Sequence, residues 1–160
     1  MGLRVGIGYD IHAVAKDRKL ILGGVSFEVG WGLDGHSDAD VLCHAIGDAL
    51  LGACGLGDLG RHFPPTDPRW KDASSIHLLG LIRAMIHGAG ARVVNVDSTV
   101  VAQEPKLAPK VVEMCRNIAE ALQIGSEKVS VKATTNEALD ALGRSEGIAA
   151  WAAVLVELED

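Results

Sequence analysis

The stretch from Gly35 to His44, reading GHSDADVLCH, concentrates side chains that can bind a metal ion or a phosphate group. In a helix from about Asp38 to Ala53, Asp40, His44 and Asp48 form one narrow polar stripe. The segment contains no Lys, Arg or Glu, although a helix face in bulk water usually carries such side chains. The stripe therefore indicates a lined cleft, with His44 as a candidate metal ligand. Equally, His44 could be an interior histidine whose ring is hydrogen-bonded to Asp40 or Asp48.

A second pair of candidate ligands follows the first predicted strand. Leu3–Tyr9 alternates apolar residues with Arg4 and two glycines, which predicts a half-buried strand whose small face permits close approach. If the chain stays extended beyond Tyr9, Asp10 and His12 project from one side and can reach one metal ion. A turn at the end of the strand would also explain this pair. Two histidines and one aspartate form a plausible catalytic zinc set, because three protein ligands leave a fourth position open for substrate.

Two further segments carry polar groups. Gly55–Trp70 is rich in glycine and proline, so we expect an irregular loop; it brings together Asp58, Arg61, His62, Thr66 and Asp67. Thr134–Glu137 follows a predicted strand, and its hydroxyls, amide and carboxylate suit phosphate oxygens and a hard cation. The same residues could equally cap a helical turn from Glu137 to Leu142.

The rest of the sequence predicts the strands and helices that hold these side chains in place. A peripheral hairpin turns at Gly23-Gly24, and Gly30–Gly35 is a loop. The helix of the polar stripe is expected to be capped by Ser37, a second helix by Ser74 or Ser75, and a third begins near Pro105 and Pro109. The other strands are expected at Arg92–Ala102, Lys128–Ala133 and Ile148–Leu158. We expect an α/β (α+β) single-domain sandwich over residues 1–160: a mixed four-stranded sheet plus the hairpin, with three helices on one face, ferredoxin-like.

Composition narrows the class of protein. The net charge of -6 and the lack of a basic run argue against nucleic acid as the main partner. Cys43, Cys54 and Cys115 have neither a disulfide framework nor a zinc-cluster spacing, so we expect small buried side chains in a reducing compartment. We expect no targeting segment and no membrane span, and hence a cytoplasmic protein.

Six blocks of the sequence, in order, resemble the 2-C-methyl-D-erythritol 2,4-cyclodiphosphate synthase family. They are GYDIH at 8–12, GHSDADVLCHAIGDALLGA at 35–53, GDLGRHFPPTDPRWK at 57–71, NVDSTVVAQEPKL at 95–107, VKATTNE at 131–137 and GRSEGI at 143–148. The resemblance implies an enzyme of non-mevalonate isoprenoid synthesis. Such an enzyme converts 4-diphosphocytidyl-2-C-methyl-D-erythritol 2-phosphate to the 2,4-cyclodiphosphate and CMP. The substrate's own 2-phosphate is the nucleophile, which agrees with the lack of an obvious protein nucleophile.

The resemblance also implies roles for individual residues. Asp10, His12 and His44 would bind Zn²⁺, and Glu137 would help to bind a second cation, Mg²⁺ or Mn²⁺. His36 and Thr135 would steady the transition state, and Ser37 would bind the 2-phosphate. The wider substrate-binding set implied is Asp10, His12, His36, Ser37, Asp58, Leu59, Gly60, Phe63, Pro64, Pro65, Thr66, Asp67, Ala102, Gln103, Glu104, Pro105, Lys106, Leu107, Ala108, Thr134, Thr135, Asn136, Glu137 and Arg144.

The family further implies a homotrimer with active sites between subunits, zinc from one and the cytidine pocket from the next. A central cavity of the family can hold an isoprenoid diphosphate, with Arg144 and Glu146 at the matching positions. Two departures stand out: Pro65 replaces an aspartate of many members, and Asp140 and Ala141 replace a common Gly-Phe pair. Two rival interpretations are a metal-dependent phosphohydrolase and a non-enzymatic trimeric module that binds a nucleotide or an isoprenoid diphosphate.

Overall fold

The sheet at the centre of the fold has five strands in the order β4-β1-β7-β5-β6. The computed structural model describes residues 2–159. The strands are β1 (Gly2–Ala15), β4 (Gly32–Leu33), β5 (Ala91–Val101), β6 (Val129–Thr134) and β7 (Gly147–Leu158). Only β5 and β6 pair in parallel, so the mixed sheet is confirmed. The sheet has one strand more than the four expected. This strand, β4, lies in the segment predicted to be a loop, and the prediction missed it because two residues are too few to show a periodicity. The ferredoxin-like arrangement stays a prediction.

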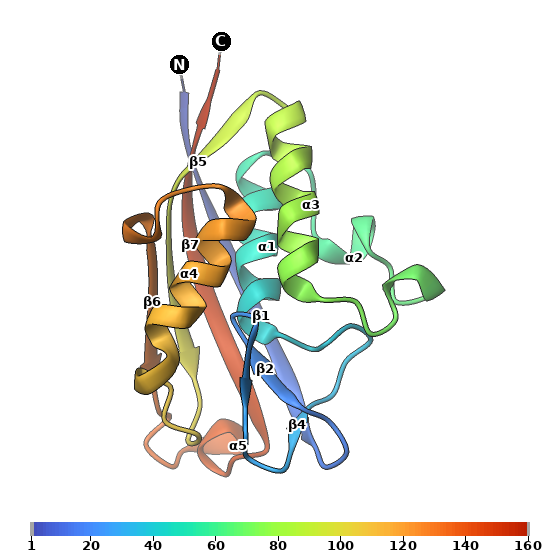
Figure 1. Cartoon of the computed structure of the whole chain (residues 1–160), viewed down its shortest axis with the longest axis vertical. Helices are drawn as coiled ribbons and strands as arrows, with labels where there is room; N and C mark the ends of the chain where they lie inside the picture. The colour runs from blue at the N-terminus through green and yellow to red at the C-terminus, as the bar shows by residue number, and fades with distance from the viewer. Residues whose placement is uncertain (1, 160) are drawn as a thin grey trace.

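Three helices cover one face of the sheet, as expected (Figure 1). They are α1 (Val41–Ala53), α3 (Ser75–Gly88) and α4 (Val111–Leu122). The hairpin of β2 (Leu20–Leu22) and β3 (Val25–Phe27) is confirmed, but it is not peripheral, since its leucines are fully buried in the core. Shorter pieces are α2 (Leu59–His62), α5 (Asp140–Gly143) and the 3-10 turns η1 (Pro68–Trp70), η2 (Ala108–Lys110) and η3 (Ser126–Lys128). The predicted irregular loop therefore contains α2 and η1.

Strand β1 lies directly against α1, and two glycines make this possible. A Cβ atom on Gly6 would lie 1.8 Å from the carbonyl oxygen of Ala49, and one on Gly8 equally close to that of Ala45. No side chain fits at these positions, so the prediction that the glycine face permits close approach is confirmed. β1 also continues past Tyr9, because Asp10 and His12 pair with Ala150 and Ile148 of β7. Asp10 and His12 therefore project from one side of an extended strand.

Two local expectations were wrong. The N-cap of α1 is Asp40 rather than Ser37: its carboxylate accepts hydrogen bonds from the amide of Cys43 at 3.1 Å and from those of Gly23 and Gly24 at 3.0 and 2.8 Å. Asp40 is fully buried, because its carboxylate accepts the hydrogen bonds of the two glycine amides in the hairpin turn. It therefore does not line the cleft, contrary to the prediction from the polar stripe. No helical turn starts at Glu137, because Glu137 and Ala138 have left-handed φ values of 51° and 60°, and the turn begins at Asp140.

The second face of the sheet carries exposed apolar side chains. Leu3, Val5, Ile7, Tyr9 and Ile11 of β1 and Trp151 of β7 are all exposed, so nothing else in residues 2–159 covers them. The rings of Tyr9 and Trp151 lie 4.5 Å apart between centroids. Within the same residues, no helix is both long and apolar enough to cross a bilayer.

Candidate active site

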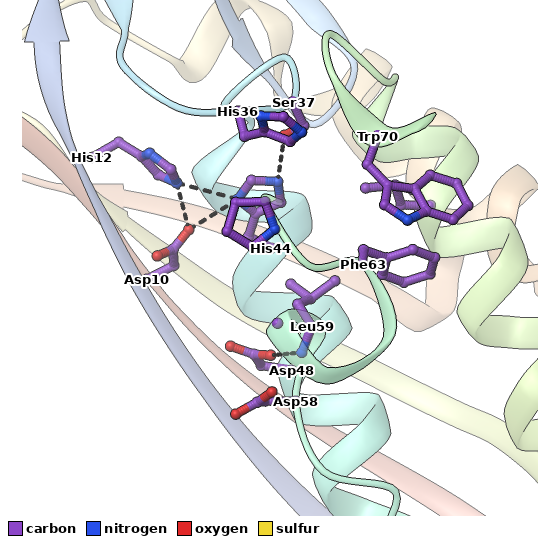
Figure 2. A pocket seen from close by; sticks show the side chains of 13 residues that line it. Asp10, His12, His36, Ser37, His44, Asp48, Asp58, Leu59, Phe63 and Trp70 are labelled. Atoms are coloured by element: carbon purple, nitrogen blue, oxygen red, sulfur yellow. Dashed lines mark hydrogen bonds and ion pairs between the residues drawn. The ribbon is translucent and has the colours of Figure 1, made fainter. Parts of the chain in front are cut away.

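Asp10, His12 and His44 form a compact triad between β1 and α1 (Figure 2). The Asp10 Oδ2 atom lies 2.8 Å from His12 Nε2 and 3.1 Å from His44 Nδ1, and the two nitrogens are 3.2 Å apart. Among residues 2–159, these are the only histidine, cysteine or acidic side chains whose donor atoms converge in this way. His44 therefore contacts Asp10, and neither Asp40 nor Asp48 satisfies its ring.

Contacts on the far side of each ring set its orientation. His12 Nδ1 hydrogen-bonds to the backbone oxygen of Asp34. His44 Nε2 lies 3.0 Å from the hydroxyl oxygens of both Ser37 and Ser75. Each ring is thus held by one nitrogen and presents the other to Asp10.

The triad fits a zinc ion. Ligand atoms at about 2.0 Å from a tetrahedral zinc lie about 3.3 Å apart. The observed separations of 2.8, 3.1 and 3.2 Å are close to this value. Two imidazoles and one carboxylate are ordinary zinc ligands, and hydrogen bonds to the outer ring nitrogens are typical of such sites. Three ligands leave a fourth position open.

Electrostatics within the triad favour an ionised carboxylate. Burial alone would raise the pKa of Asp10, but the contacts with His12 and His44 outweigh it and hold this pKa well below its ordinary value. Burial opposes the charged form of His12 in the same way, yet the Asp10 carboxylate raises the pKa of His12 above 6.5. The triad therefore already attracts positive charge.

The triad opens into a cleft of about 440 Å³. The predicted site residues that line this cleft are Asp10, His12, His36, Ser37, His44, Asp58, Leu59, Gly60, Phe63 and Pro65. Asp48 also lines it, as the polar stripe indicated, whereas Trp70 and Leu78 were not predicted. Figure 2 shows the rings of Phe63 and Trp70 on one side of this space and the carboxylates of Asp48 and Asp58 on another. The cleft therefore combines an apolar wall with acidic groups.

Asp48 fixes α2 to α1. Its Oδ1 atom accepts a hydrogen bond from the Leu59 amide at 2.8 Å, and Asp58 caps the same short helix by accepting from the Arg61 amide at 3.0 Å. Burial raises the pKa of Asp48, and the neighbouring charge of Asp58 raises it further. The only available signal for Asp48 was its place on the polar stripe.

Pro64, Thr66 and Asp67 lie in the same loop but do not line the cleft. The Asp67 carboxylate pairs with Arg69, with 2.6 Å between Oδ2 and Nη2, and this contact lowers the pKa of Asp67. The backbone oxygen of Asp67 lies 3.3 Å from His36 Nε2.

The other predicted site residues form a second cluster where β5 and β6 end. The backbone amide of Asn136 donates to Gln103 Oε1 at 2.9 Å, and the backbone amide of Ala102 donates to the backbone oxygen of Thr134 at 3.0 Å. These two hydrogen bonds join residues 102–108 to residues 134–137. The Glu137 amide donates to Thr135 Oγ1 at 3.2 Å. None of these residues lines the cleft. β6 lies three places from β1 in the sheet, which at about 4.8 Å per strand is about 14 Å.

Arg144 lies beyond α5, outside both groups of residues. Its guanidinium is exposed and pairs with Glu146, with 2.6 Å between Nε and Oε1.

Comparison with known proteins agrees with this architecture. The YgbB family model matches residues 3–157. The 2-C-methyl-D-erythritol 2,4-cyclodiphosphate synthase of Syntrophomonas wolfei is 57% identical, and the match covers 97% of this chain and 99% of that protein. The bifunctional IspDF structure from Campylobacter jejuni is 40% identical with a TM-score of 0.95, over 99% of this chain but 43% of that one. A CDP complex of IspF from Plasmodium falciparum is 34% identical with a TM-score of 0.86, over 99% of this chain and 98% of that one.

Proposed function

The chain belongs to the YgbB family of 2-C-methyl-D-erythritol 2,4-cyclodiphosphate synthases, lyases of isoprenoid biosynthesis, and from this premise we propose how its residues share the reaction. The substrate is 4-diphosphocytidyl-2-C-methyl-D-erythritol 2-phosphate. Its 2-phosphate attacks the β-phosphate, the 2,4-cyclodiphosphate forms and CMP leaves. The observation that carries this proposal is the convergence of Asp10, His12 and His44 at the wall of an open cleft.

Two cations complete the site. Asp10, His12 and His44 would hold Zn²⁺, and Glu137 would help to hold Mg²⁺ or Mn²⁺. When bound, the two cations supply positive charge that offsets repulsion between the phosphates and stabilises the leaving CMP. The geometry of the half-buried triad supports the zinc site. The Glu137 residue is exposed, so its carboxylate is accessible to the second cation.

The chain's own side chains position the substrate. Ser37 lines the cleft beside the triad, so its hydroxyl can donate to the 2-phosphate. His36 and Thr135 steady the charge that develops in the transition state. The polyol lies against the acidic and apolar wall formed by Asp58, Leu59, Gly60 and the loop from Phe63 to Asp67. Holding both phosphates in line removes an entropic barrier of up to about 7–11 kcal/mol. At Pro65 no side-chain hydrogen bond is available, so any polyol contact there comes from the backbone.

The cytidine half of the site comes from a second copy of the chain. Residues 102–108 and 134–137 form the proposed cytidine pocket and the Glu137 cation site, and none of them lines the cleft of their own chain. Association through the exposed apolar face of β1 and β7 would bring one copy's cluster to its neighbour's cleft, and would bury six apolar side chains. We propose the homotrimer on this basis. The P. falciparum relative in complex with CDP supports a cytidine nucleotide as ligand.

Two further parts of the proposal concern the assembly and its location. The cavity at the centre of the trimer would take an isoprenoid diphosphate, with Arg144 as the cationic group, although Asp140 beside it adds negative charge. Asp140 is held by Asn136 Nδ2 at 2.9 Å. A cytoplasmic location agrees with three free cysteines, none of which forms a disulfide within residues 2–159.

Mass spectrometry of the products tests the proposed reaction. The purified chain should convert the cytidyl substrate to the cyclic diphosphate and CMP, without inorganic phosphate, and a chelator should stop this conversion. Release of inorganic phosphate would show a phosphohydrolase instead. Binding without turnover would show the non-enzymatic module.

A further inference from the structure

Ser75, the first residue of α3, connects the metal triad to a carboxylate outside the cleft. Its side chain is 1% exposed. Its hydroxyl oxygen lies 3.0 Å from His44 Nε2, and the hydroxyl also hydrogen-bonds to Asp38 Oδ1. The backbone amide of Ser75 donates to the other carboxylate oxygen of Asp38 at 3.0 Å. Asp38 therefore holds Ser75 by two contacts, and Ser75 faces His44.

The direction of these hydrogen bonds follows from the chemistry of the groups. A carboxylate accepts hydrogen bonds and has none to donate, so the single hydroxyl proton of Ser75 points to Asp38. The Ser75 oxygen is then left with lone pairs facing His44. Nε2 of His44 then carries a ring proton and donates it to Ser75, so that in the neutral ring Nδ1 keeps its lone pair for a metal ion held with Asp10 and His12. We propose that Asp38 and Ser75 are positioning residues that fix the tautomer and the orientation of His44 for metal binding.

Ser37 lies equally close to His44 but has a different environment. Its oxygen is also 3.0 Å from Nε2, and the Ala39 amide donates to it at 3.3 Å. No carboxylate within residues 2–159 accepts the Ser37 hydroxyl proton, and Ser37 lines the cleft whereas Ser75 does not. The two serines therefore divide two tasks: Ser75 holds the metal ligand, and Ser37 keeps its proton for the substrate.

This inference rests on the metal site of the proposed function, and zinc affinity measures it without reference to turnover. We expect Asp38→Asn and Ser75→Ala each to raise the zinc dissociation constant about 10- to 100-fold, as is usual when a partner of a ligating histidine is removed. In Asp38→Asn, an amide NH₂ must face either the Ser75 hydroxyl or the Ser75 backbone amide, so the chain of hydrogen bonds is broken or reversed. The double variant should lose little more than the worse single variant, because both act through one chain.

The experiment is a competition titration of the full chain against a zinc-binding dye. Ser74→Ala is the matched control: Ser74 caps the same helix through the His77 amide and does not contact His44. Ser74→Ala should keep the zinc dissociation constant within about threefold of the wild-type value. A comparable loss in Ser74→Ala would overturn the proposal, because the effect would then reflect a weakened helix start. Unchanged affinity in both Asp38→Asn and Ser75→Ala would overturn it too.

Nitrogen-15 NMR of the imidazole rings in the metal-free wild-type chain gives a second readout that needs neither metal nor variant. A proton on Nε2 of His44, whether or not Nδ1 also carries one, supports the proposal, and an Nε2 without a proton overturns it. This measurement also separates the two hypotheses. A wild-type chain that binds no zinc would refute the metal site of the proposed function, whereas the tautomer still decides the role of Ser75.

Discussion

The two histidines of the triad use different ring nitrogens, and the reason lies in what each ring touches on its outer side. The Asp34 oxygen binds Nδ1 of His12, which leaves Nε2 free. The serines bind Nε2 of His44, which leaves Nδ1 free. Residue types and spacing predicted the three candidate ligands that the structure brings together, because an extended strand places Asp10 and His12 on one side. Ser75 and Asp38 could not be predicted in this way, since a serine at a helix start indicates only a cap.

At the second cation site, Glu137→Gln should shift the Mg²⁺ concentration for half-maximal activity upward by about tenfold or more. The amide keeps the shape of the side chain but removes the charge that attracts a hard cation. The measurement is activity against Mg²⁺ concentration at saturating zinc. Glu127→Gln, at an exposed position in η3, is the control and should leave the curve in place. An unchanged curve for Glu137→Gln would remove this residue from the cation site.

The buried carboxylate of Asp48 predicts a pH dependence of stability. Its pKa is raised above the ordinary 3.8, chiefly by burial. As the pH rises past 3.8 the unfolded chain loses this proton before the folded chain does, so the contribution of Asp48 to stability declines with pH. The side-chain amide introduced by Asp48→Asn does not titrate and can still accept from the Leu59 amide. The free energy of unfolding of Asp48→Asn, relative to wild type, should therefore increase from pH 4 to pH 7.

Denaturant unfolding of the metal-free chain at both pH values measures this difference. Asp17→Asn, at an exposed position, serves as the control. A relative stability of Asp48→Asn that fell with rising pH would show that burial does not disfavour the charged form of Asp48.

At the scale of elements, the site depends on the close packing of β1 on α1. Hydrophobic periodicity predicted the long strands and the three main helices, because each has a pattern repeated over several turns or alternations. It did not predict β4, the burial of the hairpin or the start of α1 at Asp40. These features depend on partners distant in sequence, such as the hairpin amides that bind Asp40. The continuation of β1 past Tyr9 likewise depends on β7 as far as Ala13 and on β4 at Val14 and Ala15.

Gly8→Ala tests this packing. The added methyl group would meet the Ala45 carbonyl oxygen at 1.8 Å, so β1 and α1 must separate. We expect a loss of about 3 kcal/mol or more in the free energy of unfolding, and weaker zinc binding because Asp10 and His12 move away from His44. Gly52→Ala in α1 is the control, since nothing lies within 4 Å of its added Cβ. It should stabilise the chain slightly or leave it unchanged. Zinc affinity at the wild-type level in folded Gly8→Ala would show that the triad tolerates this displacement.

At the scale of the whole molecule, one chain carries two incomplete halves of the proposed site. The triad and its cleft lie on β1, α1 and α2, and the Gln103–Asn136 cluster lies where β5 and β6 end. The resemblance to a known family implied that two subunits meet at each site, which the alternation of residues could not have indicated. Within a single chain, the exposed apolar residues of β1 are the feature that agrees with association between subunits.

Ile7→Lys should abolish the proposed trimer. Ile7 is 71% exposed in the single chain, and a lysine there would place a charge within the proposed interface. We expect a monomer in sedimentation-velocity experiments, with zinc still bound and cyclisation lost. Val112→Lys on α4 is the matched control, because Val112 is equally exposed at 71% but lies away from β1. A trimer formed equally well by both variants would place the interface elsewhere.

If three donor atoms from β1 and α1 bind a single zinc ion, anomalous X-ray scattering at the zinc edge will locate it in crystals of the wild-type chain grown with zinc. We expect one strong peak per chain, in contact with Asp10 Oδ2, His12 Nε2 and His44 Nδ1. A peak ligated by other residues, or no peak among these three atoms, would refute zinc binding by the triad.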